Sequence, residues 1–124
     1  KIKIEIFFAP NHTYDNNTFR ALKNSGINKI IDGYGIMPFT FDDIKFVPQL
    51  FYKLYFLPYG IQSTQIHINN WTEKDFREFE YFIKKNEKKI INADLAFSKI
   101  SNKFHIKIVN FFLKNILKLK RSIY

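Results

Sequence analysis

The stretch FFAPNHTYDNNTFRALKNSGINKIID, residues 7–32, decides the fold that we predict for this chain. An apolar, strand-forming run, residues 2–8, ends at Pro10, because proline lacks the N–H that a strand ladder requires. A polar loop and a short helix follow, and a second isoleucine-rich strand begins at Ile27. This order of strand, loop, helix and strand predicts an α/β fold with a parallel sheet.

The predicted helix has recognisable start and stop residues. Asp15 or Asn16 can cap its first backbone N–H groups, so we expect the helix to begin near Thr18. Gly26 stands where a left-handed residue would end it. The helix therefore spans little more than two turns between the two strands.

The loop after the first strand is the first candidate for a functional site, because chemistry in parallel sheets usually takes place at the carboxyl ends of strands. His12 lies in this loop, beside Pro10, Asn11 and Tyr14. The DGYG segment after the second strand is an ordinary turn in our interpretation, although Tyr34 within it can line a pocket.

Composition limits the class of protein. A chain of 124 residues with 46% hydrophobic and 19% aromatic residues predicts one ordered domain. The absence of cysteine excludes disulfides, thiolate zinc sites and cysteine nucleophiles, but it identifies no compartment. The sequence has neither a secretory segment nor an apolar run that could span a bilayer. Because Lys1 already falls in an apparent strand, we expect that the chain is a fragment whose amino-terminal part is missing.

The net charge of +9 raises nucleic acid as a partner, but the pattern argues against it. Lysines gather in residues 84–89 and 114–121, and lysine is abundant throughout the chain. Arginine-rich base readers and base-stacking platforms are missing, so we predict a solvated lysine surface and no nucleic-acid site.

A second histidine stands in an alternating run, residues 61–68, which predicts a strand. His67 points away from its isoleucine neighbours, so it faces either a functional interior or solvent. Asn69 and Trp71 follow at the carboxyl end of this strand. Trp71 is either a platform for stacking a sugar or a rim residue that covers the core.

The carboxyl-terminal third predicts helices. Thr72 begins a capping-box variant for a helix that runs to about Asn86, and Asn92 can cap the next helix. The last helix, from residue 104 to about residue 120, is amphipathic and basic, with His105 as a surface residue. Through residues 104–121 it either docks on the domain or lies on an anionic membrane surface, and we expect docking. Its apolar side carries Phe104, Ile108, Phe111, Phe112, Ile116 and Leu119.

Two segments resemble the polysaccharide deacetylase family. FFAPNH and TFRALKNSGI, within residues 7–27, resemble its third conserved segment, in which a proline loop at a strand end leads into a helix. The Ala-Pro-x-His form of this loop is most similar to a poorly characterised deacetylase-like branch. QIHIN, residues 65–69, resembles the last conserved segment, in which a histidine serves near the catalytic centre. The resemblance covers roughly the first two thirds of the chain.

The resemblance implies a partial (β/α) barrel of the polysaccharide deacetylase type, formed by residues 1–90, with a helical extension in residues 91–124. It also implies a divalent, zinc-like metal and the removal of acetyl groups from N-acetylated sugars. In such a reaction the metal lowers the pKa of a bound water, an aspartate takes its proton and a histidine donates one to the departing amine.

By the same resemblance, His67 is the catalytic acid, and His12 is a second catalytic residue that binds the substrate or the metal. A carbohydrate substrate would contact Pro10, Asn11, Tyr14, Tyr34, Asn69 and Trp71. The aspartate and two histidines that hold the metal in the family have no clear counterparts here, and Phe8 replaces the family's arginine. We therefore expect this fragment alone to be inactive.

The segment TFDD, residues 40–43, is similar to the family's first segment, in which adjacent aspartates supply a base and a metal ligand. It follows the proline loop instead of preceding it, and no His-x-x-x-His completes it. We interpret Asp42 and Asp43 as a solvated turn. Two other functions stay open: a non-catalytic carbohydrate-binding module that uses Tyr14, Tyr34 and Trp71, and a basic interaction or membrane-surface protein.

Overall fold

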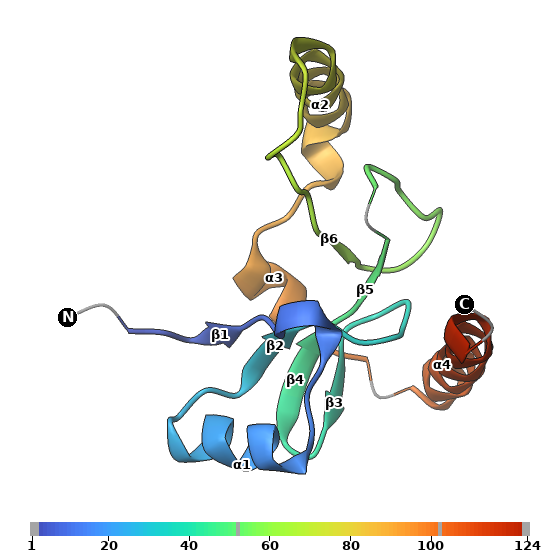
Figure 1. Cartoon of the computed structure of the whole chain (residues 1–124). Coiled ribbons are helices and arrows are strands. Elements are labelled where there is room, and N and C mark those ends of the chain that lie inside the picture. Colours follow the sequence, from blue (N-terminus) through green and yellow to red (C-terminus); the bar gives the residue numbers. More distant parts are fainter. Residues whose placement is uncertain (1–2, 52, 102, 123–124) are drawn as a thin grey trace.

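The computed structural model describes residues 3–51, 53–101 and 103–122, with only the backbone for residue 51 and for residues 117–122 (Figure 1). The strands and helices of this mixed α/β chain form a small sheet at the centre with helices around it (Figure 1).

The central sheet has four strands in the order β1, β2, β4 and β3. These strands are β1 (Ile6–Phe7), β2 (Lys29–Ile31), β4 (Ile44–Val47) and β3 (Phe39–Phe41). The first three are parallel, with Phe7 beside Ile30 and Ile30 beside Phe46, and β3 is antiparallel at the edge. The predicted parallel pairing of β1 with β2 is present, although the sheet as a whole is mixed. Strand β1 is shorter than the apolar run, because β2, the strand that pairs with it, has only three residues.

Helix α1 (Asn16–Asn24) is capped and closed as predicted. The Asp15 carboxylate accepts a hydrogen bond from the Thr18 backbone N–H at 2.8 Å. Gly26 has a φ of +73°, the left-handed conformation that glycine adopts with least strain. The helix lies on one face of the sheet (Figure 1).

The core lies on both faces of the sheet because neighbouring strand residues point in opposite directions. On the α1 face the buried residues are Phe19, Leu22, Ile30, Ile44 and Phe46. The opposite face packs against α3 (Ala93–Ser98), which Asn92 caps as predicted, and buries Val47, Ala96 and Phe97. Helix α3 is thus part of the packing of the sheet.

A second, two-stranded parallel sheet pairs β5 (Gln49–Phe51) with β6 (Ser63–Thr64). The predicted strand at residues 61–68 is therefore too long. Because β5 ends at Phe51, the residues after Thr64 have no described strand beside them, and Ile68 is 56% exposed. The described strands form two separate sheets and no closed barrel, so the partial barrel stays a prediction.

Helix α2 (Glu73–Asn86) has the predicted capping box and stands away from the central sheet (Figure 1). The Thr72 side chain accepts from the Asp75 N–H, and the Asp75 carboxylate accepts from the Thr72 N–H. None of the 14 described residues of α2 is buried. A 3₁₀ turn, η2 (Glu87–Lys89), follows, so the segment at residues 88–91 is a connection and not a strand.

Helix α4 (Phe104–Ser122) docks with the side that the sequence assigned to solvent. Ile106 is buried, and the Asn110 side chain accepts a hydrogen bond from the Ile36 N–H at 3.0 Å. The predicted apolar side is exposed instead, with Phe104 at 78% and Phe112 at 59%. The side chain of Leu119 lies outside the described residues. No helix in the described part of the chain is long and apolar enough to cross a membrane.

Candidate functional site

His12, which is partly buried, and Asp32, which is buried, form a pair at the carboxyl edge of the central sheet. His12 ends the 3₁₀ turn η1 (Pro10–His12) after β1, and Asp32 directly follows β2, the parallel neighbour of β1. His12 Nδ1 and Asp32 Oδ1 are 2.9 Å apart, and the two side chains are 14% and 6% exposed. Because a carboxylate oxygen accepts, Nδ1 carries the proton, and this fixes the tautomer of His12.

The loop that carries His12 has an unusual backbone. Asn11 and His12 have φ values of +52° and +55°, in the left-handed region that residues other than glycine rarely adopt. The Pro10 carbonyl holds the turn by accepting hydrogen bonds from the Thr13 N–H and hydroxyl. Such conformations concentrate at sites where a side chain must be held in one direction, and here that side chain meets Asp32.

The Phe8 ring contacts the His12 imidazole edge to face, with centroids 5.7 Å apart. Phe8 is the residue that stands where the resemblance would place arginine. An apolar ring in this position packs against the imidazole and supplies no charge, so Asp32 is the carboxylate that orients His12.

Asp32 has one satisfied oxygen and one unsatisfied oxygen. Its Oδ1 also accepts the Gly33 N–H at 2.6 Å, while the buried Oδ2 has no hydrogen-bond partner in the described part of the chain. An unpaired buried carboxylate oxygen is costly and therefore uncommon.

Tyr14 lies close to this pair and packs on the core through Phe19 and Phe46, with ring centroids at 5.4 and 6.2 Å. Burial, with contributions from the Asp32 charge and from Tyr34, raises the pKa of Tyr14 to about 12. The phenol therefore keeps its proton at neutral pH and can act as a hydrogen-bond donor.

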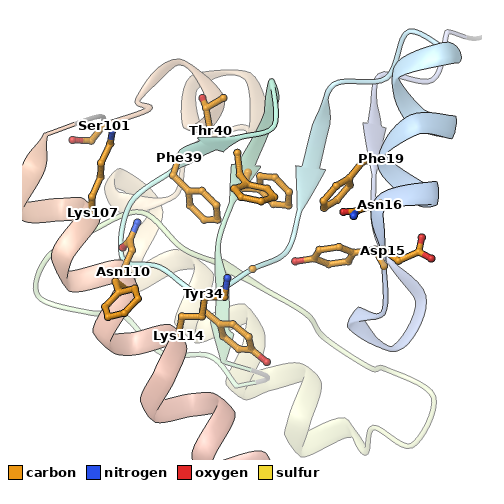
Figure 2. Close-up of a pocket in the computed structure, with 15 residues that line it drawn as sticks. Asp15, Asn16, Phe19, Tyr34, Phe39, Thr40, Ser101, Lys107, Asn110 and Lys114 are labelled. Carbon is orange, nitrogen blue, oxygen red and sulfur yellow. The ribbon is translucent and has the colours of Figure 1, made fainter.

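A cavity of about 400 Å³ lies between the central sheet and α4, and its lining includes Tyr14 and Gly33, which are neighbours of His12 and Asp32 in the chain. Figure 2 shows Lys107, Asn110 and Lys114 on one side of it and Asp15, Asn16 and Phe19 on the other. Tyr34 also belongs to this lining. Gly33 and Tyr14 are linked to Asp32, Gly33 by a hydrogen bond from its N–H and Tyr14 through the Asp32 charge. Its volume and aromatic walls are typical of small-molecule sites, which span ~300–1,000 Å³.

The other predicted site residues lie outside the cavity lining. Pro10 and Asn11 are exposed in η1 beside His12, whereas His67 and Asn69 are exposed in the segment between β6 and α2. Trp71 packs against α2, with its ring centroid 5.1 Å from that of Phe76 and 5.4 Å from that of Phe79. The hydrogen bond of His12 at this edge is with Asp32, and His67 lies in a different segment, after β6.

The aspartates of TFDD form the tight turn between β3 and β4, with φ values of +49° and +59°. Lys23 pairs with Asp42 at 2.9 Å, and both carboxylates are solvated, so the predicted turn is confirmed. No group of three His, Asp or Glu side chains within the described ranges could hold a metal ion.

Sequence reasoning did not identify Asp32 and Asn110 as site residues. Asp32 could have been found, because a carboxylate directly after the second parallel strand shares an edge with the loop after the first. Asn110 had no such signal, since its role depends on the side by which α4 docks.

Comparison with known proteins assigns the chain to no family. The chain matches no family model, no curated protein and no solved structure.

Proposed function

We propose that this chain carries the acid–base residues of a hydrolase that removes acetyl groups from N-acetylated carbohydrates. The observation that carries the proposal is the 2.9 Å hydrogen bond between His12 Nδ1 and the buried Asp32 carboxylate. The resemblance of the Ala-Pro-x-His loop and of QIHIN to polysaccharide deacetylases supplies the substrate class.

In this proposal Asp32 orients His12 and stabilises the imidazolium that forms when His12 takes a proton. With Nδ1 protonated, Nε2 is the atom that exchanges a proton with the attacking water or with the departing amine. Tyr14, kept protonated by its raised pKa, donates a hydrogen bond to a substrate oxygen. His67 remains the second candidate for the acid that protonates the amine.

The family's metal has no three-ligand group among the described residues, so the proposal routes no step through a metal. An imidazole whose Nδ1 donates to a carboxylate is also the usual form of a metal-bound histidine. His12 is therefore both the proposed acid–base and the strongest single candidate for a ligand in this chain.

The test is acetate release from N-acetylated chito-oligosaccharides by the protein, supplied with zinc, cobalt or manganese. We expect His12→Gln and Asp32→Asn each to lower the rate by about 10²-fold or more, because general acid–base catalysis contributes ~10²–10⁴. His105→Gln, at an exposed position of α4, is the matched control and should keep the rate. Equal rates in all three variants would contradict the proposal.

A second candidate function is association with an anionic membrane surface through α4. The observation that favours it is the exposed apolar side of α4, which includes Phe112 and Ile116. A basic helix with an unpacked apolar side is suited to the interface of an anionic bilayer. Phe112→Asp should abolish co-sedimentation with phosphatidylserine vesicles, and Phe76→Asp on α2 should not. Equal binding of the two variants contradicts this function.

A further inference from the structure

We propose that the cavity between the central sheet and α4 binds an anionic sugar ring, whose acidic group pairs with Lys107 or Lys114. The inference rests on the proposed carbohydrate function and adds the charge of the substrate. It is carried by the placement of two lysines on the wall of an aromatic cavity.

The two lysines face the cavity because α4 is held in one rotational position. Residues 107, 110 and 114 are separated by three and four positions, so they share one side of the helix. Asn110, between the lysines, accepts the Ile36 N–H at 3.0 Å, and Ile106 is buried beside it. This anchoring places Lys107 and Lys114 about two helical turns apart along the same wall (Figure 2).

These lysines also differ in their pairing from others in the chain. Lys23, Lys29 and Lys84 each lie within about 3 Å of a carboxylate, as in ordinary ion pairs. None of the ion pairs formed by described residues includes Lys107 or Lys114. Two ammonium groups at a cavity wall without carboxylate partners attract an anion into the cavity.

Asp15 is the one acidic residue among the described residues that line the cavity, and it does not offset the two lysines. Asp15 lies on the opposite wall (Figure 2), and its carboxylate accepts hydrogen bonds from the Thr18 N–H and hydroxyl as the cap of α1. These bonds lower the pKa of Asp15, so its carboxylate stays ionised, and the lining carries one carboxylate against the two ammonium groups of α4. The wall formed by α4 therefore sets the sign of charge that the cavity prefers.

The remaining walls favour a sugar over a simple anion. Aromatic rings, among them Tyr14, Tyr34, Phe39 and Phe111, offer apolar surface to the C–H groups of a sugar ring. Thr40, Ser101 and Asn16 bring hydroxyl and amide groups for its hydroxyls. A ligand with a carboxylate on a polyhydroxylated ring uses all three kinds of contact.

The experiment measures binding to the His12→Gln protein, which removes the proposed acid–base group and leaves the cavity lining unchanged. The probes are a disaccharide that contains glucuronic acid and its neutral glucose analogue of the same linkage, titrated by calorimetry and by NMR. We expect the acidic disaccharide to bind about tenfold more tightly, because bonds between charged partners are roughly twice as strong as neutral ones. Lys107→Gln with Lys114→Gln should remove this preference.

The matched control replaces two exposed lysines outside the cavity, Lys88→Gln with Lys99→Gln, and should keep the preference. Equal affinity for the two disaccharides overturns the inference, and so does an equal loss in the control variant. Inorganic phosphate that binds as tightly as the acidic disaccharide overturns the sugar assignment. A failure of the proposed function gives a different result. In that case the protein still binds the acidic disaccharide more tightly than the neutral one, but the wild-type protein releases no acetate.

Discussion

Helices α1 and α3, which pack on the central sheet, and helices α2 and α4, which lie outside it, all have an amphipathic sequence, but their apolar sides differ in how far they are buried. Helices α1 and α3 bury the apolar residues of one side, with Phe19 and Phe97 in the two cores. Helix α2 buries none of its described residues, and α4 leaves Phe112 mostly exposed. An apolar stripe thus indicates a helix reliably, whereas the partner of that stripe depends on the surface that the rest of the chain offers.

The largest expected effect on stability comes from replacing a phenylalanine of the central sheet by alanine, and the same replacement on α4 serves as the comparison. Phe46→Ala removes a ring that is 2% exposed and lies between α1 and the sheet, and it should lower the free energy of unfolding by about 3–5 kcal/mol. Phe112→Ala on α4 should change it by less than about 0.5 kcal/mol, as for surface positions. Urea denaturation measures both, and similar losses would show that α4 is packed as tightly as the sheet.

A smaller effect is expected where the outer part of the chain meets the sheet. A Cβ at Gly60 would clash with the Ile36 carbonyl oxygen, whereas a Cβ at Gly26 meets nothing within 4 Å. Gly26→Ala should cost about 1–2 kcal/mol for its left-handed backbone alone. Gly60→Ala should cost clearly more in the same denaturation assay, since backbone strain and the clash add. Equal costs would mean that the segment around Gly60 shifts freely against the sheet.

The smallest effect concerns the cap of α1 and depends on pH. Hydrogen bonds from Thr18 hold the pKa of Asp15 below its usual value of 3.8. A lowered folded-state pKa contributes stability that is present above pH 3.8 and is lost as the pH falls through the folded value. The Asp15→Asn protein, which keeps a capping side chain, should lose less stability than wild type between neutral pH and about pH 2. Parallel pH profiles of unfolding would contradict this assignment.

Local features could be predicted from the sequence because they depend on neighbouring residues. The cap at Asp15, the left-handed Gly26 and the capping box at Thr72 are all confirmed. Each needs only the chemistry of a few consecutive positions. The place of His12 after β1 could be predicted for the same reason.

Features that depend on distant contacts could be predicted only in part. The pairing of His12 with Asp32 joins residues 20 positions apart, and it requires the register of β1 on β2. The predicted docking side of α4 was wrong: Ile106 is buried, and Asn110 accepts a hydrogen bond from Ile36, a contact across 74 positions that the pattern of the helix alone does not encode. The predicted strand at residues 61–68 was too long. The alternating pattern does not show how long the neighbouring strand β5 is, and β5 limits the length over which residues 61–68 can pair.

Ile36 has a consequence for the exchange of amide protons with solvent. Its N–H donates to Asn110 of α4, and its carbonyl accepts the Ile61 N–H at 2.8 Å. A single opening of the loop between β2 and β3 therefore exposes both amides together. We expect deuterium to enter the Ile36 and Ile61 amides at the same rate, and Asn110→Ala to speed up both, so that two segments far apart in the chain open as one unit.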